Sequence, residues 1–209
     1  MQMMRHMIAT AVLAFTMASA VPSQATDLSV NGQIRSDGAC SITLGNGGVI
    51  DLGNLSRKDF IAGYQQIYRD MPLLINCQGP TKVGIDVIDN RAGVQSAGMN
   101  GYAFGLGDPA IGYYVMSGYV SDGHNADGRF VRMIRRSKDE TTWGEKGSGD
   151  VGLAPGYTVA WDVEGPQTEP VAFKALASGL GFRFHFRDDI AFTDELEIDG
   201  SATLELLYL

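Results

Sequence analysis

From residue 26 onward, apolar residues fall in short runs, many of them alternating with polar residues and separated by clusters of Gly, Asn and Asp. No apolar stripe with helical spacing persists through three turns. This pattern predicts an all-β domain, and many short strands with regular turn signals favour a sandwich. The predicted strands are 28–34, 40–44, 49–52, 71–77, 82–88, 103–106, 111–116, 130–134, 157–163, 171–176, 182–186 and 202–209.

The amino terminus follows a different pattern, in which Arg5 precedes an unbroken apolar run and no acidic residue occurs before Asp27. This is the layout of a secretory signal peptide. The apolar run is shorter than the roughly 20 residues that a membrane-spanning helix needs. Small residues at Ala18-Ser19-Ala20 and Ser23-Gln24-Ala25 offer two cleavage sites, and we place cleavage after Ala25. Residues 1–25 are therefore predicted to direct export.

The rest of the chain is predicted to form one domain. It contains no Pro/Ser-rich linker, and its length suffices for a single core. Residues 117–156 carry most of the Gly and charge clustering and few apolar positions, so we expect a loop-rich excursion there.

The charge of the chain is acidic. The net charge is −8, and removal of residues 1–25 takes away Arg5 and no acidic residue. Because basic residues are scattered and outnumbered, the chain lacks the positive surface that nucleic acid or anionic lipid would need. We therefore expect no nucleic-acid partner.

Two cysteines, Cys40 and Cys77, follow the predicted signal peptide. In an exported chain, an even pair is expected to form a disulfide, since the compartment is oxidising. Closing a loop of this length stabilises a fold by roughly 4 kcal/mol in the chain-entropy treatment.

Each end of the exported chain carries an extended apolar segment. In 28–34, Leu28, Val30, Gly32 and Ile34 share one face of a predicted strand, and the other face is polar. The chain ends in 202–209 without a return strand. The side chains on one face of that final segment are Ala202, Leu204, Leu206 and Tyr208.

These features, in this order, resemble the chaperone-usher pilins, and within them the β-type fimbrial major subunits. The resemblance rests on the signal peptide, the alternating extension with Gly32, Ala39-Cys40 opening the first domain strand, Cys77 closing the second, and Tyr208 as the penultimate aromatic. Further similarities are the runs 47–53, 89–93 and 104–107.

The resemblance implies an incomplete immunoglobulin-like sandwich that lacks its last strand, with 26–38 as a donor-strand extension and 39–209 as the pilin domain. Leu28, Val30, Gly32 and Ile34 would then enter the groove of a neighbouring subunit by β-strand addition, a mode of binding for which pilins are a known example. The groove and chaperone-binding strand would present the side chains Ala202, Leu204, Leu206, Tyr208 and Leu209. The implied partners are a periplasmic pilus chaperone, an outer-membrane usher and neighbouring subunits, in a fimbria at the cell surface.

A glycan-binding tip adhesin or adaptor is the alternative, with a host or surface glycan as its partner. The aromatic residues that could stack on such a glycan are Tyr102, Tyr113, Tyr114, Tyr119, Trp143 and Trp161. An enzyme is disfavoured, since none of His6, His124 and His185 has a nucleophile or metal ligand at suitable spacing. We predict no catalytic residue, no metal and no cofactor.

Overall fold

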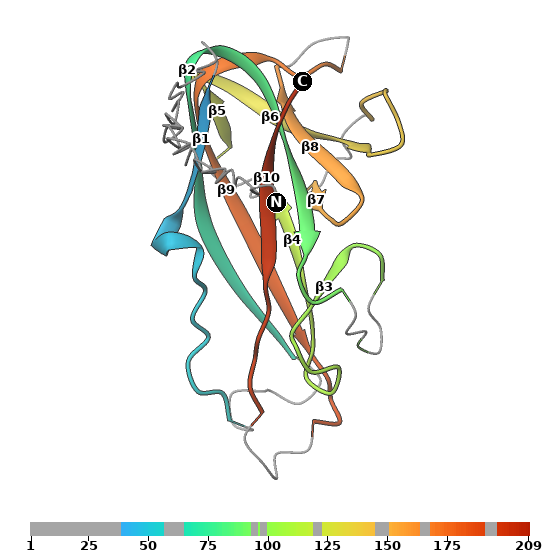
Figure 1. Ribbon diagram of the computed structural model, residues 1–209. Helices are drawn as coiled ribbons and strands as arrows, with labels where there is room; N and C mark the ends of the chain where they lie inside the picture. Colours follow the sequence, from blue (N-terminus) through green and yellow to red (C-terminus); the bar gives the residue numbers. More distant parts are fainter. Residues whose placement is uncertain are drawn as a thin grey trace, which may run out of the picture. The chain divides into compact units, whose positions relative to one another are not determined.

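The computed structural model describes residues 39–56, 65–92, 96, 100–118, 123–144, 151–163, 168–190 and 196–209, all within one unit, Arg35–Leu209. Its described elements are ten strands and one short 3-10 turn, which confirms the all-β prediction (Figure 1). They are β1 (Cys40–Leu44), η1 (Gly45–Gly48), β2 (Gln66–Asp89), β3 (Ala103–Gly105), β4 (Gly112–Gly118), β5 (His124–Ala126), β6 (Arg129–Ser137), β7 (Gly152–Leu153), β8 (Tyr157–Asp162), β9 (Ala172–Phe186) and β10 (Ala202–Tyr208).

The long strand β2 organises the fold, because it pairs with four others. Its first part pairs with β1 and β9, and its second part, Val83 to Asp89, pairs with β10 and β8. The change of partners coincides with an irregularity between Asn76 and Thr81, where Gly79 and Pro80 interrupt the β9 ladder. Sequence analysis predicted two strands here, 71–77 and 82–88, and the structure joins them into one.

The remaining strands complete a hydrogen-bonded circuit in the order β2, β8, β6, β5, β9 and back to β2. β4 and then β3 extend the sheet from β9, and β7 pairs with β4. All of the pairings are antiparallel. β9, like β2, replaces two predicted strands, 171–176 and 182–186, with one.

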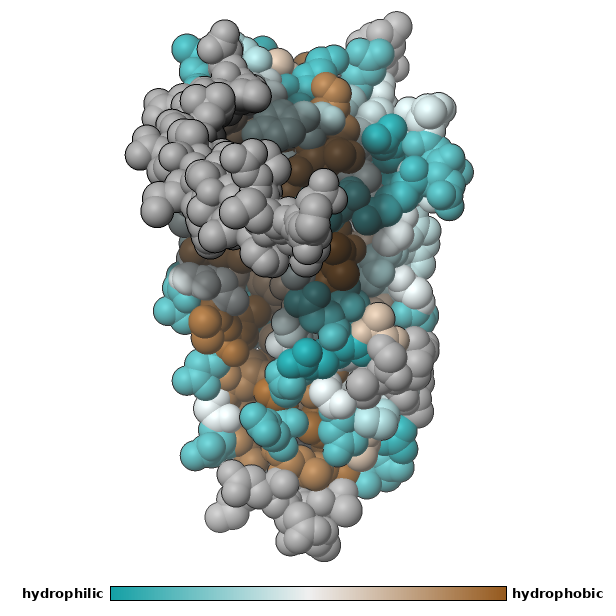
Figure 2. Space-filling view, in the orientation of Figure 1, coloured by the Kyte–Doolittle hydropathy of each residue, from teal (hydrophilic) through white to brown (hydrophobic). Residues whose placement is uncertain are grey.

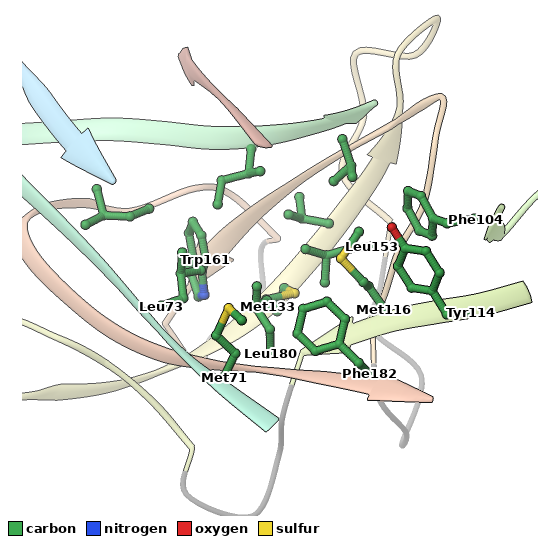
Figure 3. Packing of buried hydrophobic residues seen from close by; sticks show 14 of the residues in the cluster. Met71, Leu73, Phe104, Tyr114, Met116, Met133, Leu153, Trp161, Leu180 and Phe182 are labelled. Atoms are coloured by element: carbon green, nitrogen blue, oxygen red, sulfur yellow. The ribbon is translucent and has the colours of Figure 1, made fainter. Parts of the chain in front are cut away.

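The core lies between the strands of this circuit, and Trp161, Phe173 and Leu73 are among its fully buried side chains. Figure 3 shows Trp161 beside Leu73, with Met116, Phe182 and Tyr114 continuing the cluster toward Phe104. Alternation along β9 explains this packing, since every second side chain from Leu180 to Phe186 is buried.

The stretch 117–156 contains more regular structure than its composition suggested. β5, β6 and β7 lie in its described part, and β6 contributes Val131, Met133 and Ile134 to the buried interior. The sequence pattern identified a strand at 130–134 but missed β5 and β7. Strands as short as these carry too few alternating positions to be recognised.

Cys40 and Cys77 form the predicted disulfide, and they are direct cross-strand partners of β1 and β2. The predicted strand 49–52 is not observed as a strand, since residues 49–56 form no ladder. Residues 28–34 lie outside the described residues, so this predicted strand remains a prediction.

Candidate functional site

A groove of about 1020 Å³ runs between two segments that are distant in the sequence, residues 44–55 and residues 196–204. In Figure 1, the first segment descends from β1 on one side and β10 runs along the other. Figure 2 shows hydrophobic surface between them in the lower half of this face. The side chains of the groove floor come from β2, the β3–β4 region, β9 and the segment that follows β9: Met71, Leu106, Ile111, Tyr114, Met116, Leu180, Phe182, Phe184, Phe186 and Ile190.

The groove is flanked by strand edges that pair with no further strand among the described residues. Among the described residues, β10 pairs with β2 and with no second strand, and β1 likewise pairs with β2 alone. Residues 49–56 are not in a strand and pair with no ladder in the described part. A strand edge that retains free N–H and C=O groups beside an apolar surface is a template for another strand.

The wall formed by β10 presents its apolar face to the core. Ala202, Leu204 and Leu206 are half-buried and pack against the core cluster, whereas Thr203 and Glu205 are exposed. Their register opposite Asp89, Val87 and Ile85 of β2 fixes this orientation. Leu207 and Leu209 are both exposed, at 36% and 40%. They lie on the other face of the final segment.

Tyr208 lies at the end of β10 and is 53% exposed. Its phenol oxygen accepts a hydrogen bond of 2.9 Å from the backbone N–H of Cys40. This bond joins the last strand to the first at the disulfide. Leu209 donates its own N–H to the carbonyl of Lys82, which places it beside β2.

The opposite end of this wall is held by Asp89, the last residue of β2, and by Asn90 and Arg91, which follow it. The Asn90 amide donates to Ser201 Oγ at 2.9 Å and to Thr203 Oγ1 at 3.1 Å. The Arg91 guanidinium binds the carboxylate of Asp199 at 2.5 Å and its backbone carbonyl at 3.1 Å. These contacts fix the segment that enters β10, so they position the rim of the groove.

Asp89 links the end of β2 to β3 at this end of the groove. Its carboxylate accepts hydrogen bonds from the N–H groups of Arg91 and Gly105, at 2.8 and 3.1 Å. The nearby phenol of Tyr114 lies in the groove floor, and burial, reinforced by the negative charge of Asp89, raises its pKa well above the ordinary value. Tyr114 is therefore neutral at physiological pH, and the floor it helps to form carries no charge from this group.

The candidate glycan-stacking aromatics differ in their exposure to solvent. Tyr114 and Trp161 are buried in the core, whereas Tyr102 is 42% exposed. Tyr113 stacks on His185 with ring centroids 4.7 Å apart, and Trp143 lies under the guanidinium of Arg136 at 4.9 Å. Tyr119 lies outside the described residues, as do the proposed donor residues Leu28, Val30, Gly32 and Ile34.

The free energy of unfolding of the domain is expected to depend on pH through His124. It is buried, with 6% of its surface exposed, and its Nδ1 lies 2.7 Å from Ser178 Oγ. Burial lowers its pKa below the ordinary value of 6.5, because the charged imidazolium would lose its hydration. The unfolded chain therefore binds more protons than the folded one below pH 6.5, so this contribution to stability is complete above pH 6.5 and declines as the pH falls toward the folded-state pKa.

We expect urea melts of the H124Q variant to show a smaller loss of stability between pH 7 and pH 5 than the wild type. His185, whose pKa is also lowered by burial, serves as the matched control, because it is less buried and H185Q should change the profile less. Identical pH profiles for the wild type and H124Q would contradict the assignment.

Among the described residues, no three His, Cys, Asp or Glu side chains gather in a way that could hold a metal ion. No helix in the described part of the chain is long and apolar enough to cross a membrane.

No curated protein matches the chain significantly. A family model described as a protein of unknown function, DUF1120, matches residues 28–113. The matched segment includes both cysteines, the groove wall that follows β1, and all of β2. Over these residues the chain is similar to the DUF1120 family.

Proposed function

We propose that this chain is a structural subunit of a bacterial surface fimbria and polymerises by strand donation. The observation that carries the proposal is the groove between residues 44–55 and 196–204, which combines an apolar floor with unpaired strand edges. In this interpretation the domain is an immunoglobulin-like sandwich that lacks its last strand. The amino-terminal extension of another copy supplies that strand.

The periodicity of the floor supports this occupant. Leu180, Phe182, Phe184 and Phe186 line the groove from alternate positions of one strand. A strand lying along them would place its own inward side chains at the same period of two residues. The extension offers Leu28, Val30 and Ile34 at that period, with Gly32 between them. Gly32 allows close approach of the two backbones.

The energetics of this insertion are favourable. Burying three aliphatic side chains contributes roughly 5 to 9 kcal/mol, at 1.5 to 3 each, before the ordering of the extension is subtracted. Backbone hydrogen bonds to the unpaired edges add to this. Polymerisation of this kind would draw its free energy from apolar burial together with strand pairing.

The same groove explains why partners are needed before assembly. An exposed apolar floor beside open strand edges promotes aggregation, so a periplasmic chaperone would occupy the groove through the β10 edge until an outer-membrane usher brings the next subunit. The chain would reach the cell surface through the periplasm. The Cys40–Cys77 disulfide fits such a route, because an oxidising compartment favours it.

The proposal can be tested by adding a missing strand in trans. A chain that starts at residue 35 should gain thermal stability when a synthetic peptide of residues 26–36 is added, because the peptide binds the folded state alone. The melting temperature should rise with peptide concentration. It is measured by circular dichroism.

A matched peptide carrying V30D is the control. A carboxylate on the inward face would be buried against Phe182 and its neighbours without a partner, so this peptide should give little or no shift. Equal shifts from both peptides, or none from either, would count against an open groove.

A further inference from the structure

A second candidate site lies away from the groove, where Tyr102, Arg135 and Tyr157 meet. Arg135 belongs to β6 and Tyr157 opens β8, two strands that pair directly. Tyr102 comes from the turn before β3. The rings of Tyr102 and Tyr157 are stacked, with centroids 5.5 Å apart and an interplanar angle of 23°.

The guanidinium of Arg135 lies over both rings, at 5.2 Å from the centroid of Tyr102 and 4.8 Å from that of Tyr157. Cation–π contacts of this kind orient the guanidinium without neutralising its charge. Arg135 also donates one hydrogen bond, of 3.3 Å, from Nη1 to the carbonyl of Gly152. Most of its five N–H donors are therefore not used by that bond.

The charge around Arg135 is unusual for so acidic a chain. Residues 129–138 contain five basic residues and no acidic one, although Asp139 and Glu140 follow directly and the charge of Glu140 contributes to raising the pKa of Tyr157. Lys138 is paired with Asp86 at 3.0 Å, and Arg136 lies over Trp143 and donates to the carbonyl of Glu140. In the described part of the chain, no carboxylate lies within ion-pair distance of Arg135. A half-buried guanidinium without a carboxylate is a natural receptor for one.

The two tyrosines add a second kind of contact. Tyr102 is 42% exposed, so its ring offers an apolar surface for stacking. The phenol oxygens lie 3.2 Å apart, and their hydrogen bond is the main factor that raises the pKa of Tyr157. Tyr157 therefore remains protonated at neutral pH, and the hydroxyl groups can both donate to and accept from a polyhydroxylated ligand.

We propose that Tyr102, Arg135 and Tyr157 form a binding site for a sugar ring that bears a carboxylate. The carboxylate pairs with the guanidinium of Arg135, the C–H face of the sugar stacks on the exposed tyrosine ring, and sugar hydroxyls bond to the phenols. A single contact of this kind is weak. Many copies along a fibre would compensate through multivalency, and this avidity, unlike the site itself, rests on the proposed function. The site does not depend on the groove or on polymerisation.

The test is isothermal titration calorimetry, in which sodium glucuronate is titrated into the full-length exported chain at low ionic strength. Glucose and sodium acetate are the matched probes. Glucose keeps the sugar ring without the carboxylate, and acetate keeps the carboxylate without the ring. We expect glucuronate to bind at least about tenfold more tightly than either probe, since charge-assisted hydrogen bonds and stacking both contribute. Equal binding of acetate would show an adventitious anion site and overturn the proposal, as would equal binding of glucose.

Variants localise the site. R135Q should weaken glucuronate binding about tenfold or more, and R135K should weaken it less, since lysine keeps the charge and loses the bidentate fork. Y102A removes the exposed stacking face, and it should also weaken binding. R183Q is the control, because Arg183 lies 5.1 Å from the Tyr68 ring in a comparable pair with a single tyrosine.

Three results would overturn the assignment. One is unchanged binding in both R135Q and Y102A, and another is an equal loss of binding in R183Q. The third is an oligomer of the wild-type chain that R135Q dissociates, because the partner of Arg135 would then be an acidic side chain of a second copy. Melting curves of each variant establish that the comparison is made between folded proteins.

Discussion

Removal of residues 26–34 should abolish assembly into fibres and leave the disulfide-bonded domain folded. The deletion takes away Leu28, Val30 and Ile34, the side chains proposed to fill a neighbour's groove, and with them roughly 5 to 9 kcal/mol of gross stabilisation at each subunit contact. It removes none of the described strands. Electron microscopy and size-exclusion chromatography of the purified protein measure the outcome.

Two substitutions refine this experiment. The double variant S29A/N31A changes the opposite face of the extension and should assemble normally, whereas V30D places a charge on the inward face and should not assemble. Normal fibres from the deletion variant would refute the donor role of the extension. Normal fibres from V30D would refute its proposed orientation.

Loss of the Cys40–Cys77 disulfide is expected to have the next largest effect. The double variant C40A/C77A should lower the free energy of unfolding by roughly 4 kcal/mol, because the bridge closes a loop of 37 residues in the unfolded chain. For a domain of this size, that corresponds to a decrease of about 10 °C in melting temperature. Thermal melts of the variant, and of the wild type under reducing conditions, should agree.

The matched control is S41A, adjacent to the bridge on an exposed position of β1. It leaves the disulfide intact, so its stability should remain within about 0.5 kcal/mol of the wild type. An unchanged melting temperature in C40A/C77A would show that the paired strands β1 and β2 hold this region without the covalent link.

The sequence was sufficient for the fold class, because alternation of apolar and polar residues is a local signal. It located the cores of eight described strands and the cysteine pair. It failed where local and tertiary signals conflict. The prediction divided β2 between 77 and 82 and β9 between 176 and 182, yet both strands continue. β9 keeps its pairing with β2 at Gly179, which lies opposite Pro72, whereas β2 passes Gly79 and Pro80 with its β9 ladder interrupted.

The residues that line the groove could not be predicted from the sequence pattern, since its floor combines residues from β2, β4 and β9. Residues 49–52 illustrate the difficulty, because their apolar pattern predicted a strand and the structure gives them no ladder. Ile50 and Leu52 instead line a wall of the groove. The Tyr102, Arg135 and Tyr157 cluster was missed because it depends on the register of β6 against β8, and no periodicity within one segment reveals such a register.

The position of the disulfide has a mechanical consequence for a fibre built in this way. Tension along the fibre would enter each domain through its extension, immediately before Cys40, and would pass across the bridge to Cys77 in β2. The chain from Ser41 to Asn76 would then carry no load, because the covalent bond shortens the path. Force would reach the long strand β2 near its middle and act on ladders with β9 and β10 along their length. Rupture would therefore require many hydrogen bonds to break together, so each subunit would resist being pulled open.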